Sequence, residues 1–328
     1  MNTTGKIIPI AFPDTFVRYS EEKILNYFFP FVGLGRKKYI KAGHAILLLV
    51  ENKTGNIQYF DFGRYITPLG KGRVRSAKTD VELHIPIKAE INSSGHIENI
   101  DKILLWLDAH PEKTHGSRRL VASICHDVDY KKAIHFLTNL QDQGSIPYLT
   151  FGNVGSNCSR LVADTLIYSS NDAKIIKVLK RNSSFTPSPL GNVKYGASGG
   201  KIYQVLDGKI GEYDGHMLKE NLTNYFDPRI PKIVENKLSN KRGEAQLLSG
   251  IGASAYFELQ ATDCVNKYVI KRYTPKFEKD FEGEFTIDQS GFTIKKPYHF
   301  VYDSNCSFCH IKQNDKVYRF DLIEVTYS

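Results

Sequence analysis

A cysteine stands at the predicted start of an amphipathic helix, within residues 155–164. Ser156 and Asn157 precede Cys158, and both have side-chain oxygens that accept free N–H groups of a first helical turn. Apolar residues at 161, 162, 163, 166 and 167 predict one buried face. A thiol at this place feels the positive end of the helix dipole, which lowers its pKa and populates the thiolate. The pattern therefore predicts a nucleophilic Cys158.

A nucleophilic thiol needs a general base, and His44 is the histidine best placed by its local sequence. It follows Gly43 at the start of a predicted buried strand over 43–50, and turn residues at 52–55 predict a hairpin with a strand over 56–62. If the strands pair outward from the turn, Ile46 opposes Asp61, so Asp61 is a diagonal neighbour of His44 on the same face. A carboxylate there would hold the imidazole ring. His115 and His126 remain alternative bases.

These segments resemble the permuted NlpC-type branch of the papain-like fold, which includes lipid acyltransferases similar to lecithin:retinol acyltransferase. The residues that carry the resemblance are Gly43-His44-Ala45, the acid on the next strand, and Asn157-Cys158-Ser159-Arg160-Leu161-Val162. His44 precedes Cys158 by 114 residues, which is the permuted order. The resemblance covers about residues 1–182 and implies an α+β domain with an antiparallel sheet packed on helices.

The resemblance also implies a thioester mechanism without a cofactor. Cys158 would attack a carbonyl carbon, His44 would move the proton, Asp61 would orient His44, and the Cys158 backbone N–H would form half of an oxyanion hole. The function that follows is a cysteine amidohydrolase or peptidase for a peptide or peptidoglycan-stem substrate. Two alternatives stay open: an acyltransferase on the same scaffold, and an inactive papain-like module that binds a partner.

Arginines and an aromatic residue follow the predicted acid. In a functional interpretation they bind an acidic substrate, because arginine donates paired hydrogen bonds to carboxylates. In a structural interpretation they pair with Asp80, Glu82 or the C-terminal half. The residues concerned are Arg64, Tyr65, Arg73 and Arg75.

Two further cysteines form a C-x-x-C-H string at 306–310. Haem attachment to such a string needs export, and the N-terminus shows no secretory signal. A zinc site would need four ligands, for which the candidates are Cys306, Cys309, Cys264 and either His310 or His299. The alternative that we favour is a reduced pair at a hairpin turn. We therefore expect no metal and no cofactor.

Length and composition predict two domains in the 328 residues. We expect a catalytic domain over 1–182, a linker rich in proline, serine and glycine over 183–200, and a β-rich accessory domain over 201–328 that could contact a protein partner. Other predicted strands lie at 6–12, 81–91 and 120–125. Other predicted helices lie at 21–29, 101–109, 130–140, 171–181 and within 216–225.

The net charge of +9 favours an anionic partner. We find no nucleic-acid-binding module, so we expect no nucleic acid. The sequence contains no run of about 18 apolar residues, so we predict no membrane span. Five scattered cysteines indicate reduced thiols. With no secretory signal, we expect a cytoplasmic protein or export by a signal-independent system.

Overall fold

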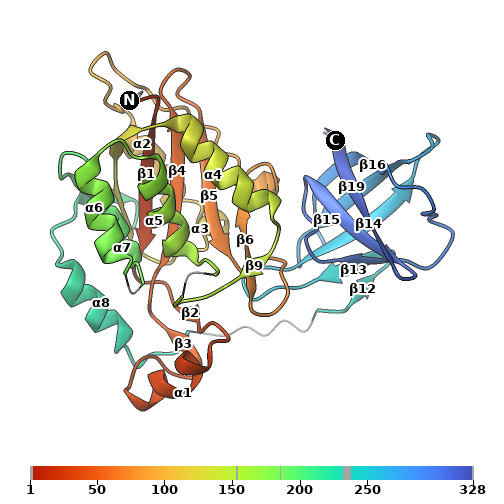
Figure 1. Ribbon diagram of the computed structural model, residues 1–328, viewed down its shortest axis with the longest axis horizontal. Helices are drawn as coiled ribbons and strands as arrows, with labels where there is room; N and C mark the ends of the chain where they lie inside the picture. The colour runs from red at the N-terminus through yellow and green to blue at the C-terminus, as the bar shows by residue number, and fades with distance from the viewer. Residues whose placement is uncertain (1–2, 153, 185, 232–237, 327–328) are drawn as a thin grey trace. The chain divides into compact units, whose positions relative to one another are not determined.

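The computed structural model describes residues 3–152, 154–184, 186–231 and 238–326. The chain forms two compact units, of which the first comprises residues 1–62, 84–143 and 147–233. The second comprises residues 63–83, 144–146 and 234–328. The first unit is α+β with an antiparallel sheet, and the second is β-rich, as the sequence predicted (Figure 1).

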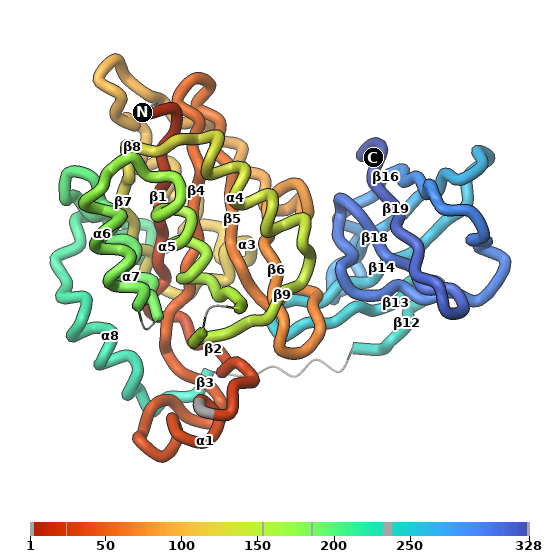
Figure 2. Tube along the Cα trace, viewed as in Figure 1, coloured from red at the N-terminus to blue at the C-terminus, as the bar shows by residue number. Residues whose placement is uncertain are grey.

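The sheet of the first unit runs in the order β11-β10-β7-β1-β4-β5, and β8, labelled in Figure 2, also pairs with β1. β1 pairs with β4 antiparallel along its whole length. The strands of this unit are β1 (Gly5–Phe12), β2 (Val17–Arg18), β3 (Tyr39–Ile40), β4 (His44–Glu51), β5 (Ile57–Gly63), β7 (Leu120–Ser123), β8 (Cys125–Val128), β10 (Ile202–Leu206) and β11 (Lys209–Glu212). The short β9 (Ile146–Pro147) stands where the chain passes between the units.

Helices cover the faces of this sheet, and Figure 1 draws α4, α5, α6 and α7 in front of it and α2 behind it. α5 packs on β4, and α7 packs on β1 and β7. The helices are α1 (Lys23–Phe31), α2 (Ile100–Asp108), α3 (Pro111–Thr114), α4 (Tyr130–Asp142), α5 (Cys158–Ser169), α6 (Ala173–Asn182), α7 (Pro189–Gly196) and α8 (Met217–Tyr225). None of the helices in the described ranges has the length and apolar character that crossing a bilayer requires.

The two central strands explain why the sequence shows apolar runs here instead of alternation. Every residue of β1 is buried, and so is every residue of β4 except the last. A strand covered on both faces reads as a continuous apolar run. The hairpin from β4 to β5 has the predicted register, with Ile46 opposite Asp61 and Leu47 opposite Phe60.

The second unit is built on an antiparallel sheet in the order β12-β13-β14-β15-β16-β19-β18-β17. Its core includes Phe257, Ile270, Phe285, Ile311 and Phe320. Residues 63–83 contribute β6 (Lys71–Arg75) and the short helix η1 (Val81–Leu83). The remaining strands are β12 (Lys241–Arg242), β13 (Ala245–Leu248), β14 (Ala255–Ala261), β15 (Lys267–Tyr273), β16 (Lys279–Thr286), β17 (His299–Val301), β18 (Phe308–Gln313) and β19 (Lys316–Val325).

The boundaries between domains differ from those expected from the sequence. The expected linker over 183–200 contains α7, whose Ser188 cap accepts a hydrogen bond from Gly191 N at 3.0 Å. Leu190 and Val193 of this helix are buried against Val121. Proline and serine there begin a helix, because proline is tolerated at its first position and serine caps it. Residues 202–205 of β10, expected in the β-rich domain, pair with β7 in the first unit, and β11 pairs with β10.

The strand expected over 81–91 is also wrong. Residues 81–83 form η1, and the rest of the range forms no named strand. Leu83, Ile85 and Ala89 are buried, which accounts for the alternation of apolar and polar residues. The apolar and polar residues thus alternate because some side chains of an irregular segment are buried, although this segment has no continuous strand partner.

The position of β10 predicts the effect of a substitution in it. Val205 is fully buried, so Val205→Ala should lower the free energy of unfolding by about 2 kcal/mol, because two methyl groups leave a cavity. Urea denaturation of the full chain measures this change. The exposed Lys209 on β11 gives the control, since Lys209→Ala should change stability very little. Equal effects of the two substitutions would contradict the placement of β10 in the first unit.

Candidate active site

Cys158 is the first residue of α5, as the sequence predicted. Asn157 is the N-cap, and its side-chain oxygen accepts a hydrogen bond from Arg160 N at 2.9 Å. The amide nitrogen of the same side chain donates to Leu149 O at 2.8 Å, which ties the helix start to the preceding loop. Cys158 is 7% exposed. The sulfur is therefore held at the positive end of the helix dipole, in a largely dry environment.

His44 begins β4, and Asp61 lies diagonally across the hairpin on β5. The distance between His44 Nε2 and Asp61 Oδ2 is 3.9 Å, which is an ion-pair distance, and a side-chain hydrogen bond with Asp61 helps to raise the pKa of His44. Asp61 is completely buried. Its Oδ2 accepts a hydrogen bond from the Tyr59 hydroxyl at 2.9 Å, which fixes the carboxylate.

Gly43 sets the direction of the chain just before His44. Its φ is +79°, and a Cβ there would lie 3.2 Å from Phe12 O and 3.3 Å from Pro189 Cγ. A side chain at this position would be strained by both the dihedral angle and the close neighbours. The glycine thus lets β4 begin where His44 meets the start of α5.

Cys158 and His44 alter each other's protonation through a side-chain hydrogen bond. Burial by itself lowers the pKa of His44, but Asp61 and Cys158 beside the ring raise it to about 9. Burial raises the pKa of the Cys158 thiol, yet the contribution of His44 outweighs it and holds the pKa below 9.0. Both shifts favour the thiolate and the imidazolium near neutral pH.

Three residues at this site had no role assigned from the sequence. Tyr59 binds Asp61, and its position two residues earlier on β5 puts it on the same face, a signal that strand periodicity could have given. The Ala45 backbone and the Ser159 side chain hydrogen-bond to Cys158 and help to lower its pKa. Contacts of this kind depend on how α5 docks against β4, which spacing along the chain does not reveal.

The structure gives structural partners to residues that we interpreted as possible substrate-binding groups. Arg64, Tyr65, Arg73 and Arg75 all belong to the second unit and are all under 9% exposed. Arg73 donates to both carboxylate oxygens of Asp80 at 2.7 Å, and Arg75 stacks 3.5 Å from the centroid of the Tyr65 ring. The structural alternative holds, because buried cations need paired charges or aromatic faces.

A further buried arginine, Arg272, completes this cluster. Arg272 of β15 binds Asp280 Oδ2 at 2.9 Å and Glu82 Oε2 at 2.5 Å, and it lies 3.5 Å from Asp80 Oδ1. The arginines hold the pKa of Asp80 at about 2 against the effect of burial. Segment 63–83 is thus fastened to the C-terminal strands by ion pairs.

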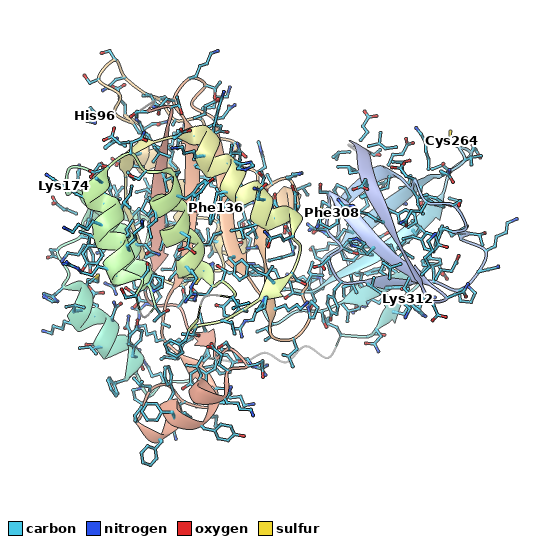
Figure 3. All side chains as sticks on the ribbon, viewed as in Figure 1. His96, Phe136, Lys174, Cys264, Phe308 and Lys312 are labelled. Carbon is cyan, nitrogen blue, oxygen red and sulfur yellow. The ribbon has the colours of Figure 1, made fainter. Side chains whose placement is uncertain are left out.

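The candidate zinc ligands are not gathered at one point. Cys306 and Cys309 lie in the core of the second unit, and burial raises the pKa of Cys306 to about 12. Cys264 is exposed, and Figure 3 labels it at a different part of that unit from Phe308, the neighbour of Cys309. His310 Nδ1 lies 3.1 Å from Asp303 O. Within the described ranges, no group of three or more His, Cys, Asp or Glu side chains is arranged to hold a metal ion.

The alternative bases occupy other places. His115 follows α3 in a left-handed conformation, and His126 lies edge-on to the His96 ring at 5.4 Å between centroids. Neither histidine is among the described residues that line the cavity at Cys158. Among the three histidines considered, His44 is the one coupled to Cys158.

A cavity of about 350 Å³ has Asn157, Cys158 and Ser159 in its wall. Its other walls are mainly apolar, and they include Tyr19, Leu25, Phe28, Phe29, Leu34 and Ile40. The volume is at the small end of the range for ligand pockets. The nucleophile candidate therefore faces a space that suits an apolar group.

A second cavity, of about 880 Å³, shares Phe28, Phe29 and Phe151 with the first. Its wall also carries charged groups, namely Arg160, Asp164 and Lys180. Burial raises the pKa of Asp164. An apolar space and a space with charged groups in its wall thus share the same aromatic residues.

Comparison with known proteins places the chain in a family. No curated protein matches it. The crystal structure of the type VI secretion system effector TseH is similar at 17% identity and a TM-score of 0.42, over 65% of this chain and all of that one. The model of the DUF6695 C-terminal domain matches residues 245–323. The model of the type VI secretion system effector TseH-like family matches residues 7–175. Since that match spans more than half of the chain, this protein belongs to the type VI secretion system effector TseH-like family.

Proposed function

We propose that this protein is a cysteine amidohydrolase or peptidase that cleaves an amide bond through a thioester on Cys158. The observation that carries the proposal is the mutual shift of pKa between Cys158, which lines a cavity, and His44, which forms a side-chain hydrogen bond with it. Strongly shifted groups in a cavity are typical of active sites. We further propose the permuted NlpC-type arrangement of the papain-like fold, with His44 on a strand before Cys158 on a helix.

The proposed reaction has two halves. The Cys158 thiolate attacks the carbonyl carbon, and the oxyanion that forms accepts a hydrogen bond from the Cys158 backbone N–H, which is free of intrahelical partners at a helix start. The His44 imidazolium then gives its proton to the leaving amine as the C–N bond breaks. In the second half, His44 takes a proton from water, the hydroxide attacks the thioester, and the thiolate leaves with a carboxylic acid as product.

Asp61 is a positioning residue in this scheme. Its charge stabilises the imidazolium, and its hydrogen bond from Tyr59 keeps the carboxylate in place. The same arrangement of nucleophile, base and acid operates in other hydrolases.

The two cavities support a peptide or peptidoglycan-stem substrate. An apolar side chain would fit beside Cys158, and carboxylates of the same substrate would lie near Arg160 and Lys180. Membership of an effector family supports export by a type VI secretion system, in line with the expected signal-independent route.

A second candidate is acyl transfer on the same site, and the apolar wall at Cys158 favours it. The first half of the reaction would be unchanged, but an alcohol or amine of an acceptor would replace water in the second half. The products separate the two candidates, because hydrolysis yields a free acid and transfer yields a new ester or amide.

The shifted pKa predicts selective alkylation of Cys158. In a Cys264→Ser background, iodoacetamide near neutral pH should modify Cys158 faster than the other cysteines, because its lowered pKa enlarges the thiolate fraction. His44→Ala should slow this modification at least about tenfold, since burial then raises the pKa without compensation. Peptide mass spectrometry of each cysteine measures the rates.

The other buried cysteines are internal controls for that measurement. Burial raises the pKa of Cys125 to about 11 and of Cys306 to about 12, so neither should react in the folded protein. A modification of Cys158 no faster than theirs, or one unaffected by His44→Ala, would argue against the activated thiol.

Turnover tests the function itself. Incubation with purified peptidoglycan should release fragments with new amino ends, detected by liquid chromatography and mass spectrometry. Cys158→Ala should abolish release, and His44→Ala should slow it by about 10²–10⁴-fold because the general acid is lost. The rate should fall as the pH rises through about 9, where the imidazolium loses its proton.

Cys264→Ser is the matched control. Because Cys264 is exposed in the second unit, this substitution should leave turnover unchanged. Cleavage that survives Cys158→Ala would disprove the thioester mechanism. A new ester or amide as the product, in place of a free carboxylic acid, would favour acyl transfer instead.

A further inference from the structure

Three strongly exposed aromatic side chains of the first unit lie on α1. Tyr27 is 79% exposed, Phe28 52% and Phe31 87%. The opposite side of α1 faces inward, where Leu25 is buried and the Phe29 ring meets the Tyr19 ring edge-on at 5.9 Å. Figures 1 and 2 draw α1 with β2 and β3 at one end of the unit, beyond the ends of the long strands. The helix thus presents aromatic rings to solvent from a projecting position.

Exposed cations belong to the same segment of the chain as these rings. Lys23, Arg36, Lys37 and Lys38 are exposed, and the last two have positive φ values in the loop before β3. The acids of the segment have partners: Glu21 lies 3.8 Å from Arg18, and the Glu22 carboxylate accepts hydrogen bonds from Thr150 N and Phe151 N. Residues 17–40, which we call the α1 segment, therefore combine exposed aromatic rings with an excess of positive charge.

We infer that the α1 segment docks onto the surface of a bilayer that contains anionic phospholipid. Aromatic rings favour the boundary between headgroups and acyl chains, and lysine and arginine are attracted to anionic headgroups. A helix with both features lies in the plane of the interface. Charge complementarity thus favours a lipid surface over an apolar protein groove, which would leave the cations without partners.

The docking surface continues into the cavity at Cys158. Phe28 is exposed on α1 and also lines that cavity, together with Leu25 and Phe29. Docking would hold this wall of the cavity against the membrane, so substrate would reach Cys158 from the lipid surface. The inference goes beyond the proposed hydrolysis and does not depend on it.

Vesicle sedimentation of the full chain tests the inference. In the Cys158→Ala background no turnover alters the lipids, so a failure of the proposed reaction cannot imitate a failure to bind. The protein should sediment with vesicles of phosphatidylcholine and phosphatidylglycerol, at roughly three parts to one, and much less with phosphatidylcholine alone. Added salt should weaken the binding, because it screens exposed charges.

Two sets of substitutions separate the contributions of rings and charges. Tyr27→Ser with Phe31→Ser, and Lys37→Gln with Lys38→Gln, should each weaken binding roughly tenfold. These side chains are exposed, so folding should be preserved, as circular dichroism would verify. The matched control is Val265→Ser with Lys312→Glu, an exposed apolar residue and an exposed lysine of the second unit (Figure 3), which should bind as the parent does.

Several outcomes would overturn the inference. One is absence of sedimentation with the anionic vesicles, and another is equal binding by the control and the α1 variants. Light scattering gives a third: a dimer of the parent that Phe31→Ser converts to a monomer, without vesicle binding, would show that a second copy covers the α1 segment.

Discussion

The thiol of Cys158 and the imidazole of His44 are both almost completely buried, and each stabilises the charged form of the other. A single charge in such a place would be costly, because desolvation opposes it. Two opposite charges in contact offset much of that cost. The site is therefore a coupled unit, and removal of either partner should return the other to its neutral form.

Several neighbouring groups stabilise the charged forms of Cys158 and His44. α5 brings its positive end to the sulfur, and the Ala45 backbone and Ser159 add hydrogen bonds. Asp61 adds negative charge near the ring, and Tyr59 holds that carboxylate. These groups come from two strands and one helix, so the packing of α5 on β4 is what assembles the site.

Local rules were sufficient for the parts of the site that neighbouring residues determine. Turn residues and strand periodicity gave the pairing of Ile46 with Asp61, and an N-cap preference gave the start of α5 at Cys158. Long-range packing decided the rest. Residues 202–206 look like any short strand, yet this strand, β10, pairs with β7 in the first unit. The sequence alone suggests that Arg73 could bind a ligand, but its guanidinium donates hydrogen bonds to Asp80 and Thr79. Neither partner choice is encoded in spacing along the chain.

The composition of the second unit has a consequence for how the chain matures. Residues 63–83 leave the ribosome long before Arg272, which stands 192 positions after Asp80 in the sequence. Until that arginine is synthesised, Asp80 and Arg73 lack the third member of their cluster and the apolar strands that cover it. The second unit must therefore form after translation is nearly finished. A chain truncated before β15 would lack the strands that cover residues 63–83, which follow Asp61 in the sequence.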